Sequence, residues 1–188
     1  MSGLEKPAKV IILDGVSSAG KTTLAREIQA LAQETFLHIE MDKFISFLPN
    51  GDEFKPKWFR LDKVDGPSGK LPRISNGPSG EALLSVMRQF VFNAGQKGLN
   101  MVVDEVCHAS EIADYRAGLA GCDLCVGKVD APIDVIEARE KARGDRLIGL
   151  ACEQSSHLHE GIGYDLEVDT HATATGALAR ELLAAVSS

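Results

Sequence analysis

The sequence predicts an α/β fold with a five-stranded parallel sheet and helices on both of its faces, and three observations support this prediction. Short apolar runs alternate with segments of helical periodicity along the 188 residues. A glycine-containing loop joins the first strand to the first helix with the spacing of a phosphate-binding loop. Acidic residues follow several strands, and parallel strands bring their carboxyl ends to one edge of a sheet. Right-handed crossover helices would then cover both faces.

Each element follows from its local pattern. Runs rich in apolar residues predict strands over 9–13, 36–41, 99–103, 123–129 and 166–168. Apolar residues three or four positions apart predict helices over 21–34, 80–97, 110–119, 133–143, 147–157 and 174–186. In the first of these helices, for example, Leu24, Ile28 and Leu31 share one face. The elements alternate regularly except between residues 48 and 79.

That exception is a stretch rich in proline and glycine. Residues 65–69 read as a turn between two extended pieces, near residues 58–61 and 71–74. We therefore expect a small hairpin on the rim of the sheet, within an insert over residues 43–80. At about 150 residues per domain, residues 1–188 are expected to form a single domain that includes this insert.

Composition excludes several classes of protein. The formal net charge is −7, whereas proteins that bind nucleic acid as their main partner need clustered Lys and Arg. No apolar run approaches the roughly 20 residues that span a bilayer, and residues 10–13 are too short for the core of a signal peptide. We therefore expect a cytoplasmic protein with no nucleic-acid or membrane partner, whose four cysteines are reduced thiols.

The glycine-containing loop carries the strongest functional signal. Gly15-Val16-Ser17-Ser18-Ala19-Gly20-Lys21-Thr22 matches GxxxxGK[ST] and lies between a predicted strand and a predicted helix. In such a P-loop, backbone N–H groups and the helix N-terminus hold phosphate oxygens, and the lysine reaches the β- and γ-phosphates. The residues expected to bind the nucleotide here are Gly15, Ser17, Ser18, Ala19, Gly20, Lys21, Thr22 and Thr23.

A magnesium site is expected beside this loop. The apolar run over 99–103 ends in Asp104 and Glu105, which is the Walker B pattern. Thr22 supplies a hydroxyl and Asp104 a carboxylate, so both are predicted Mg²⁺ ligands, Asp104 directly or through water. The alternative for Asp104 is a solvated strand end.

Other motifs narrow the class of P-loop protein to small kinases. The nearest string to the guanine-binding NKxD motif, residues 127–130, lacks the asparagine, and no DxxG motif occurs. Arg139, Arg143 and Arg146 cluster in a segment that we interpret as a lid over residues 140–160. Arginines of a lid would stabilise the charge of the transferred phosphoryl group. The alternative is a solvated helix with charged pairs.

A kinase also needs a group that accepts the proton of the attacking hydroxyl. Asp42 follows the second predicted strand at the expected ligand-binding edge of the sheet. Its carboxylate could act as a general base, or it could be the N-cap of the segment that begins at Lys43. The residues alone leave both interpretations open.

The chain resembles the chloramphenicol phosphotransferase family of P-loop kinases. This resemblance covers nearly the whole chain and is most specific in its last third; it is carried by Gly15–Thr23, Asp42, Asp104-Glu105, Ala142–Arg146, His159–Gly161, Tyr164-Asp165 and Val168–Thr170. It implies a sheet like that of shikimate and nucleotide monophosphate kinases, with ATP as donor. It further implies the primary hydroxyl of an antibiotic as acceptor, a role in antibiotic resistance, and Asp42 as base.

The chain departs from the family pattern mainly where an acceptor would bind. Val16 and Glu105 replace a glycine and an aspartate, and residues 43–80 match poorly. Five of the ten aromatic residues lie in this stretch and could form either an acceptor wall or a local core; they are Phe44, Phe47, Phe54, Trp58 and Phe59.

The sequence therefore predicts an ATP- and Mg²⁺-dependent kinase of a small-molecule hydroxyl, with Asp42, Lys21, Arg143 and Arg146 as catalytic residues and Arg139 and Arg143 on the nucleotide. Two alternatives stay open. One is a kinase of another small alcohol or antibiotic, and the other is a nucleotide-binding regulatory module that acts through a partner protein. The sequence names neither the acceptor nor the oligomeric state, and a homo-oligomer is compatible with it.

Overall fold

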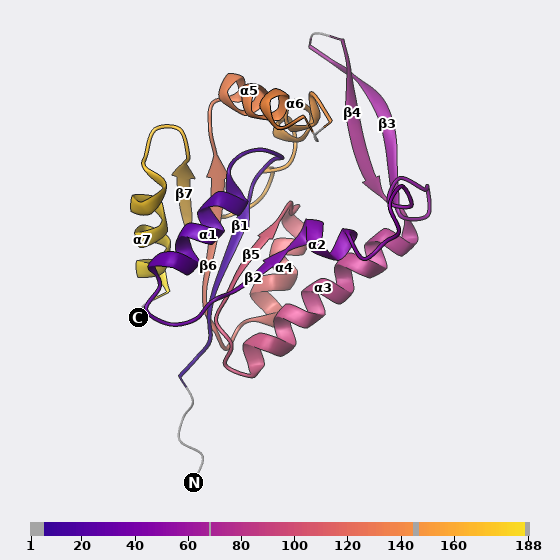
Figure 1. Cartoon of the computed structure of the whole chain (residues 1–188). Coiled ribbons are helices and arrows are strands. Elements are labelled where there is room, and N and C mark those ends of the chain that lie inside the picture. Colours follow the sequence, from indigo (N-terminus) through magenta and orange to yellow (C-terminus); the bar gives the residue numbers. More distant parts are fainter. Residues whose placement is uncertain (1–5, 68, 145–146, 187–188) are drawn as a thin grey trace.

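Five parallel strands form the central sheet of the protein (Figure 1). The computed structural model describes residues 6–67, 69–144 and 147–186. The strands lie in the order β2-β5-β1-β6-β7, and every pairing between them is parallel. Their bounds are β1 Lys9–Asp14, β2 Leu37–Glu40, β5 Met101–Glu105, β6 Asp123–Asp130 and β7 Leu166–Asp169. The predicted α/β fold and its five-stranded parallel sheet are confirmed.

Alternation along the central strand β1 explains why both faces of the sheet are covered. Val10 and Ile12 belong to one buried apolar cluster, whereas Ile11 and Leu13 belong to another. Successive side chains of a strand point to opposite faces, so an uninterrupted apolar run requires packing on both. All four side chains are fully buried.

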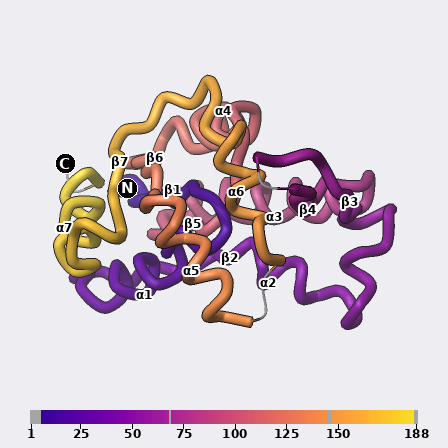
Figure 2. The backbone as a smooth tube through the Cα atoms, turned by 90° about the horizontal axis from the view of Figure 1, so that it is seen from above, coloured from indigo at the N-terminus to yellow at the C-terminus, as the bar shows by residue number. Residues whose placement is uncertain are grey.

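Two pairs of helices provide this cover (Figures 1 and 2). Helices α1 (Lys21–Leu31) and α7 (Thr175–Ala185) pack on one face, where Leu24 and Leu182 are buried. Helices α3 (Pro78–Gln96) and α4 (Ala109–Gly118) pack on the other, where Met87 and Tyr115 are buried. Three more helices lie near the carboxyl ends of the strands: α2 Met41–Ile45, α5 Ile133–Arg143 and α6 Leu150–Ser155.

The expected hairpin is present and is longer than the sequence suggested. Strands β3 (Phe59–Gly66) and β4 (Gly69–Asn76) form a separate antiparallel sheet. Figure 2 shows α6 lying between this hairpin and the central sheet, and β4 and α6 are in contact. The hairpin therefore lies beside the central sheet, on the far side of α6.

The structure corrects the bounds of two predicted elements and adds one helix. The strand expected over 99–103 runs from Met101 to Glu105, so both acidic residues lie within β5 and not after it. The helix expected over 147–157 is confined to residues 150–155, because Gly149 has a φ of 88° at its start. A short helix, α2, follows β2 directly and was not among the predicted helices. No helix in the described part of the chain is long and apolar enough to cross a membrane.

Candidate active site

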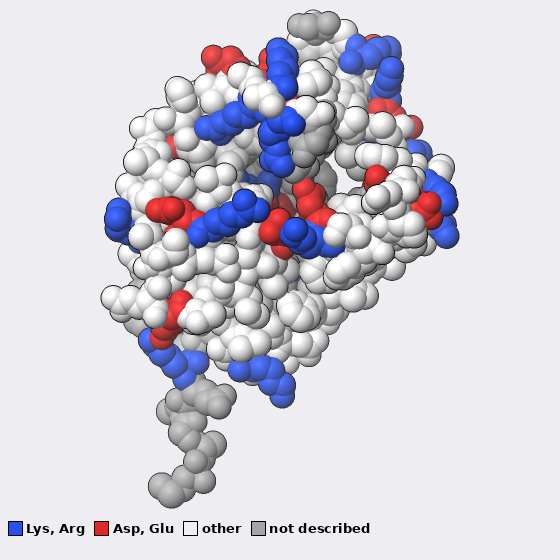
Figure 3. Space-filling model, viewed as in Figure 1, with Lys and Arg blue, Asp and Glu red and all other residues white. Residues whose placement is uncertain are grey.

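A cavity of about 1150 Å³ lies at the carboxyl edge of the sheet, between the P-loop and the hairpin. Its phosphate-loop half is formed by Ser17, Ser18, Gly20, Lys21, Thr22, Thr23, Asp104, Arg139, Arg143 and Thr170. Its hairpin half is formed by Met41, Asp42, Ile45, Glu53, Phe54, Phe59, Arg73, Ile74, Leu84, Arg88, Glu105 and His108. Figure 3 shows the opening of this cavity as a hollow with basic side chains above it and acidic side chains along its lower rim.

The backbone of the P-loop turns tightly around its own centre. Gly20 has a φ of 106° and Ser18 a φ of 61°, both in the left-handed region. At Gly15 a Cβ atom would lie only 2.2 Å from the carbonyl oxygen of Val129, so a larger residue would force the loop off β6. These positions curl the loop before α1 begins at Lys21.

Two hydroxyl groups of the loop are buried without a partner. Among the described residues, Ser17 Oγ and Ser18 Oγ are two of the few buried side-chain atoms that make no hydrogen bond. A buried donor without a partner costs about 1–3 kcal/mol. Phosphate oxygens would supply the missing acceptors, so the loop fits a nucleotide.

Lys21 is folded back onto this loop. Its Nζ atom donates hydrogen bonds to the carbonyl oxygens of Gly15, at 2.7 Å, and Val16, at 3.1 Å. Nζ also lies 3.9 Å from Asp104 Oδ1. The ammonium group therefore already lies at the loop in which it would contact the phosphates of a nucleotide.

Thr22 and Asp104 meet as the sequence predicts. The Thr22 hydroxyl donates a hydrogen bond of 2.6 Å to Asp104 Oδ2. Burial alone would raise the pKa of Asp104, but His38, Lys21 and Thr22 oppose this effect and hold that pKa below its usual range. A hydroxyl and an ionised carboxylate are hard oxygen ligands, so this pair fits Mg²⁺.

His38 adds to this site a group that sequence reasoning missed. Its Nε2 atom is buried without a hydrogen-bond partner and lies 3.8 Å from Asp104 Oδ2. A separation above 3.5 Å suits a bridging water. Strand pairing could have indicated it, because β2 runs beside β5 and places Glu40 opposite Asp104.

The three arginines of the predicted lid differ in their positions and contacts. Arg139 donates hydrogen bonds to Thr170 Oγ1, at 2.9 Å, and to the P-loop carbonyl of Ala19, at 3.3 Å. Arg143, the last residue of α5, is exposed and lines the same cavity. Arg146 lies outside the described residues.

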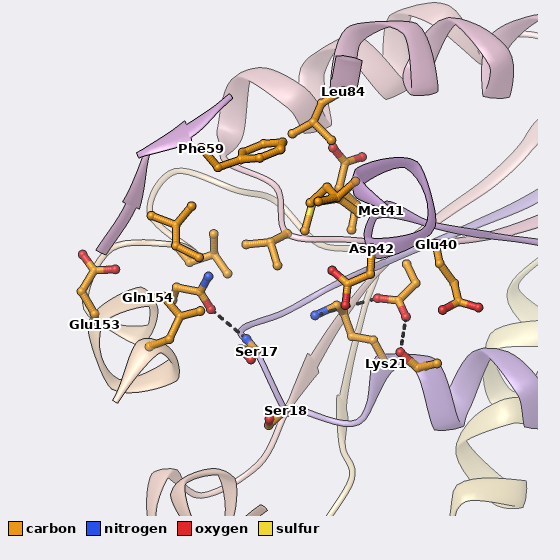
Figure 4. Close-up of a pocket in the computed structure, with 18 of the residues that line it drawn as sticks. Ser17, Ser18, Lys21, Glu40, Met41, Asp42, Phe59, Leu84, Glu153 and Gln154 are labelled. Carbon is orange, nitrogen blue, oxygen red and sulfur yellow. Dashed lines mark hydrogen bonds and ion pairs between the residues drawn. The ribbon is translucent and has the colours of Figure 1, made fainter. Parts of the chain in front are cut away.

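Asp42 lies in the cavity but does not cap a helix. It is the second residue of α2, whose N-cap is Glu40, so the interpretation of Asp42 as an N-cap is wrong. Figure 4 shows Asp42 pointing toward the part of the cavity that also holds Lys21. Glu40 and Glu53 are further carboxylates on the cavity wall.

A buried network of charged and polar side chains, centred on Arg88 and Glu105, lies at the hairpin half of the cavity. Arg88 of α3 donates a hydrogen bond of 2.8 Å to Glu105 Oε1, and the Tyr115 hydroxyl donates one of 2.5 Å to Oε2. Arg88 also binds Glu81 at 3.1 Å. Burial raises the pKa of Glu105 to about 7, although Tyr115 and Arg88 act against this increase. Sequence analysis singled out Glu105 but had no signal for its partners.

Replacing Arg88 with methionine should destabilise the fold. Without Arg88 the pKa of Glu105 would rise further, so its carboxyl group would be protonated at neutral pH, and the lost hydrogen bonds would cost about 1–3 kcal/mol. Chemical denaturation would measure the loss. Adding Glu105→Gln should recover part of it, because a neutral amide still accepts the Tyr115 hydroxyl. If Arg88→Met is as stable as the wild type, the network does not stabilise the protein.

Four of the five aromatic residues of the insert divide into two pairs, and the fifth, Trp58, does not line the cavity. Phe54 and Phe59 line the cavity. Phe44 packs against Phe47 and Phe90, with ring centroids 5.3 and 6.4 Å apart, and so belongs to the α2–α3 contact. Of the five residues that could form either an acceptor wall or a local core, two therefore line the cavity.

Helix α6 contributes residues that no sequence motif indicated. The backbone N–H of Ser17 donates a hydrogen bond of 2.8 Å to Gln154 Oε1. The neighbouring Glu153 is buried and binds Arg73 of the hairpin. These contacts join segments far apart in the chain, so local patterns carry no trace of them.

Taken with the parallel sheet, this P-loop and its Thr22–Asp104 pair define the class of the protein, which is that of the P-loop NTPases. The chain belongs to the family described as chloramphenicol phosphotransferase-like protein, which it matches over residues 8–187. Two curated relatives, from two strains of Mycobacterium tuberculosis, are provisionally named O-phosphotransferases. Each is 31% identical to this chain over 97% of this chain and 83% of the relative. The family and these relatives support the interpretation of this chain as a small-molecule kinase.

Solved structures share the fold at low sequence identity. A sugar kinase from Janibacter sp. HTCC2649 has a TM-score of 0.66 at 17% identity and covers 95% of this chain and 94% of its own. The APS kinase CysC of Mycobacterium tuberculosis, in complex with AMPPNP and APS, has a TM-score of 0.65 at 16% identity and covers 97% and 99%. Shikimate kinase from Acinetobacter baumannii has a TM-score of 0.57 at 18% identity and covers 95% and 92%.

Proposed function

We propose that this protein transfers the γ-phosphate of ATP to a hydroxyl group of a small molecule, with Mg²⁺ as cofactor. The observation that carries the proposal is that one cavity joins a P-loop, on one side, to a carboxylate and an apolar wall on the other. A nucleotide's phosphates and a second molecule can therefore meet in a single cavity. A P-loop protein that only binds nucleotide does not need the second half.

The proposed reaction assigns a role to each side chain on the phosphate side. Loop N–H groups and Lys21 would hold the phosphates, and Thr22 and Asp104 would hold Mg²⁺. Bound Mg²⁺ would neutralise the charge that develops on the β- and γ-phosphate oxygens. The bond from the hydroxyl oxygen to the γ-phosphorus forms, the bond to the β–γ bridging oxygen breaks, and ADP leaves.

Asp42 would orient the attacking hydroxyl and accept its proton. It lies on the cavity wall at the start of α2. Lys21 lies in the same part of the cavity (Figure 4). The attacking oxygen would therefore lie between the base and the transferred group.

The segment over residues 140–160 would act as a lid that brings its arginines to the transferred group. Arg143 is expected to contribute more to the transition state than to binding of ground-state ATP, since charge on the phosphoryl group is redistributed during transfer. Arg146 is assigned the same role from the sequence alone. Arg139, which is bonded to the loop and Thr170, would steady the nucleotide site.

Replacing Arg143 with alanine should therefore lower kcat by about 10- to 100-fold, the value of one charge-assisted hydrogen bond. The KM for ATP should change much less. Steady-state kinetics with varied ATP separate the two effects. A variant in which only the KM rises would show that Arg143 binds ground-state phosphate.

The charges of the hairpin half favour an acceptor that is not an anion. Of the described residues in this half, the two arginines are each committed to a buried carboxylate, Arg73 to Glu153 and Arg88 to Glu105. The remaining wall is largely apolar; it includes Met41, Ile45, Phe54, Phe59, Ile74 and Leu84. An uncharged alcohol with an apolar or aromatic body, such as chloramphenicol, suits this wall.

The experiment that tests the proposal is a screen of small hydroxyl compounds for stimulated release of ADP from Mg²⁺-ATP. Chloramphenicol and other uncharged aromatic alcohols should stimulate release, and mass spectrometry should find the phosphorylated product. Shikimate, a carboxylate anion, is the control that should not. ATP binding without stimulation by any alcohol, together with a protein complex that forms only with nucleotide, would favour the regulatory module.

A further inference from the structure

Helix α6 lies between the two halves of the active-site cavity, and two consecutive side chains on it serve different partners. Figure 4 shows Glu153 and Gln154 pointing away from each other, with Gln154 directed at Ser17. The Ser17 backbone N–H donates to Gln154 Oε1 at 2.8 Å. Because the partner is an N–H donor, the oxygen of the amide must face the loop and its NH₂ group must face elsewhere.

Gln154 is bonded to the loop that would hold the phosphates of a nucleotide. Backbone N–H groups of a P-loop hold phosphate oxygens, and the Ser17 N–H belongs to this loop. The adjacent hydroxyls of Ser17 and Ser18 are buried without partners. A phosphate that satisfies these hydroxyls would also take the Ser17 N–H, which frees the Gln154 amide to turn its NH₂ group toward the phosphate oxygens.

Glu153 fixes the position of α6 from the other side. Only 4% of this residue is exposed, and its Oε1 accepts hydrogen bonds from Arg73 Nε of β4 and from His157 Nε2, the latter at 3.0 Å. The ring of His157 stacks on His108, with centroids 5.7 Å apart. At the start of α6, a Cβ atom on Gly149 would lie 3.0 Å from Leu71 Cδ2, which shows how closely the hairpin packs there.

We propose that Gln154 is a phosphate-binding residue of this kinase, and that Arg73 and Glu153 are positioning residues that hold it at the P-loop. The proposal rests on the proposed function, because it assigns the phosphate to a nucleotide bound by the loop. The hairpin, which would form the acceptor wall, is thereby linked to Gln154: Arg73 of the hairpin binds Glu153, and Glu153 precedes Gln154 in α6.

Two substitutions of Gln154 separate phosphate binding from a structural role. Gln154→Glu keeps an oxygen for the Ser17 N–H but replaces the NH₂ donor with a negative oxygen, and Gln154→Ala removes both. Titration calorimetry with Mg²⁺-ATP and no acceptor should show a rise in Kd of about tenfold for Gln154→Ala, and a larger rise for Gln154→Glu. The melting temperature of nucleotide-free Gln154→Glu should stay close to that of the wild type.

Gln33→Glu is the matched control, because it adds the same charge at an exposed position after α1. It should leave the Kd unchanged. If both Gln154 variants bind ATP within twofold of the wild type, Gln154 does not bind phosphate and the proposal is wrong. If the wild type itself binds no ATP, it is the proposed function that fails, so the two failures are distinguishable.

A double-mutant cycle tests the positioning role of the ion pair. Arg73→Met should weaken ATP binding severalfold although Arg73 lies in the hairpin half, and Arg73→Lys should restore most of the affinity. In the Gln154→Ala background, Arg73→Met should have almost no further effect. Additive losses would overturn the positioning role. Arg60→Met is the control, because Arg60 makes an exposed ion pair with Asp62 in the same hairpin.

Discussion

Lys21→Ala is expected to abolish phosphoryl transfer, with a loss of about 10³-fold or more, because the loop loses the cation that neutralises the transferred group. ATP affinity should fall as well. Lys21 is buried, and its Nζ atom lies between the loop carbonyls and Asp104. Rates of ADP release with saturating acceptor, and calorimetry with ATP, would measure both effects.

The control for this variant is Lys97→Ala, which removes an exposed lysine after α3. Its turnover should equal that of the wild type. The melting temperature of Lys21→Ala shows whether the loop keeps its shape without the bonds to Gly15 and Val16. Normal turnover by a folded Lys21→Ala protein would contradict the assignment as a kinase.

Asp42→Asn is expected to lower kcat by about 10²–10⁴-fold, which is the usual contribution of a general base. ATP affinity should hardly change, because the proposed role of Asp42 is to orient the acceptor hydroxyl and not to bind phosphate. Asparagine has nearly the same size as aspartate but cannot accept the proton. Since Asp42 is inside α2 and is not its N-cap, the melting temperature should also stay close to that of the wild type.

Three further variants make this test specific. Glu40→Gln and Glu53→Gln neutralise two further carboxylates of the cavity wall, and their losses should be much smaller than that of Asp42→Asn. Asp114→Asn, on the exposed side of α4, should have no effect. If Asp42→Asn keeps its turnover while Glu53→Gln loses it, the base is Glu53 and the role of Asp42 must be withdrawn.

Local patterns in the sequence were sufficient to predict the fold and to bring together the residues of the P-loop half of the cavity. Apolar runs of strand length, such as Val10–Leu13, specify buried strands because alternate side chains need cover on both faces of a sheet. The P-loop spacing is equally local, since it depends on Gly15 and Gly20 within one turn. Thr22 and Asp104 could be paired because parallel strands end at one edge, and the structure places them 2.6 Å apart.

The sequence by itself therefore determined the α/β sheet, the P-loop and the kinase class, whereas only the tertiary structure decided how the second half of the cavity is built. The structure shows that Asp42 is not an N-cap, that Phe44 and Phe47 pack against each other and do not line the cavity, and that Arg88 binds Glu105. It also brought Gln154 to Ser17, which is 137 residues away in the chain. The physical reason is that such contacts depend on where helices and loops pack, and a single side chain that meets a distant partner leaves no periodic pattern in the sequence.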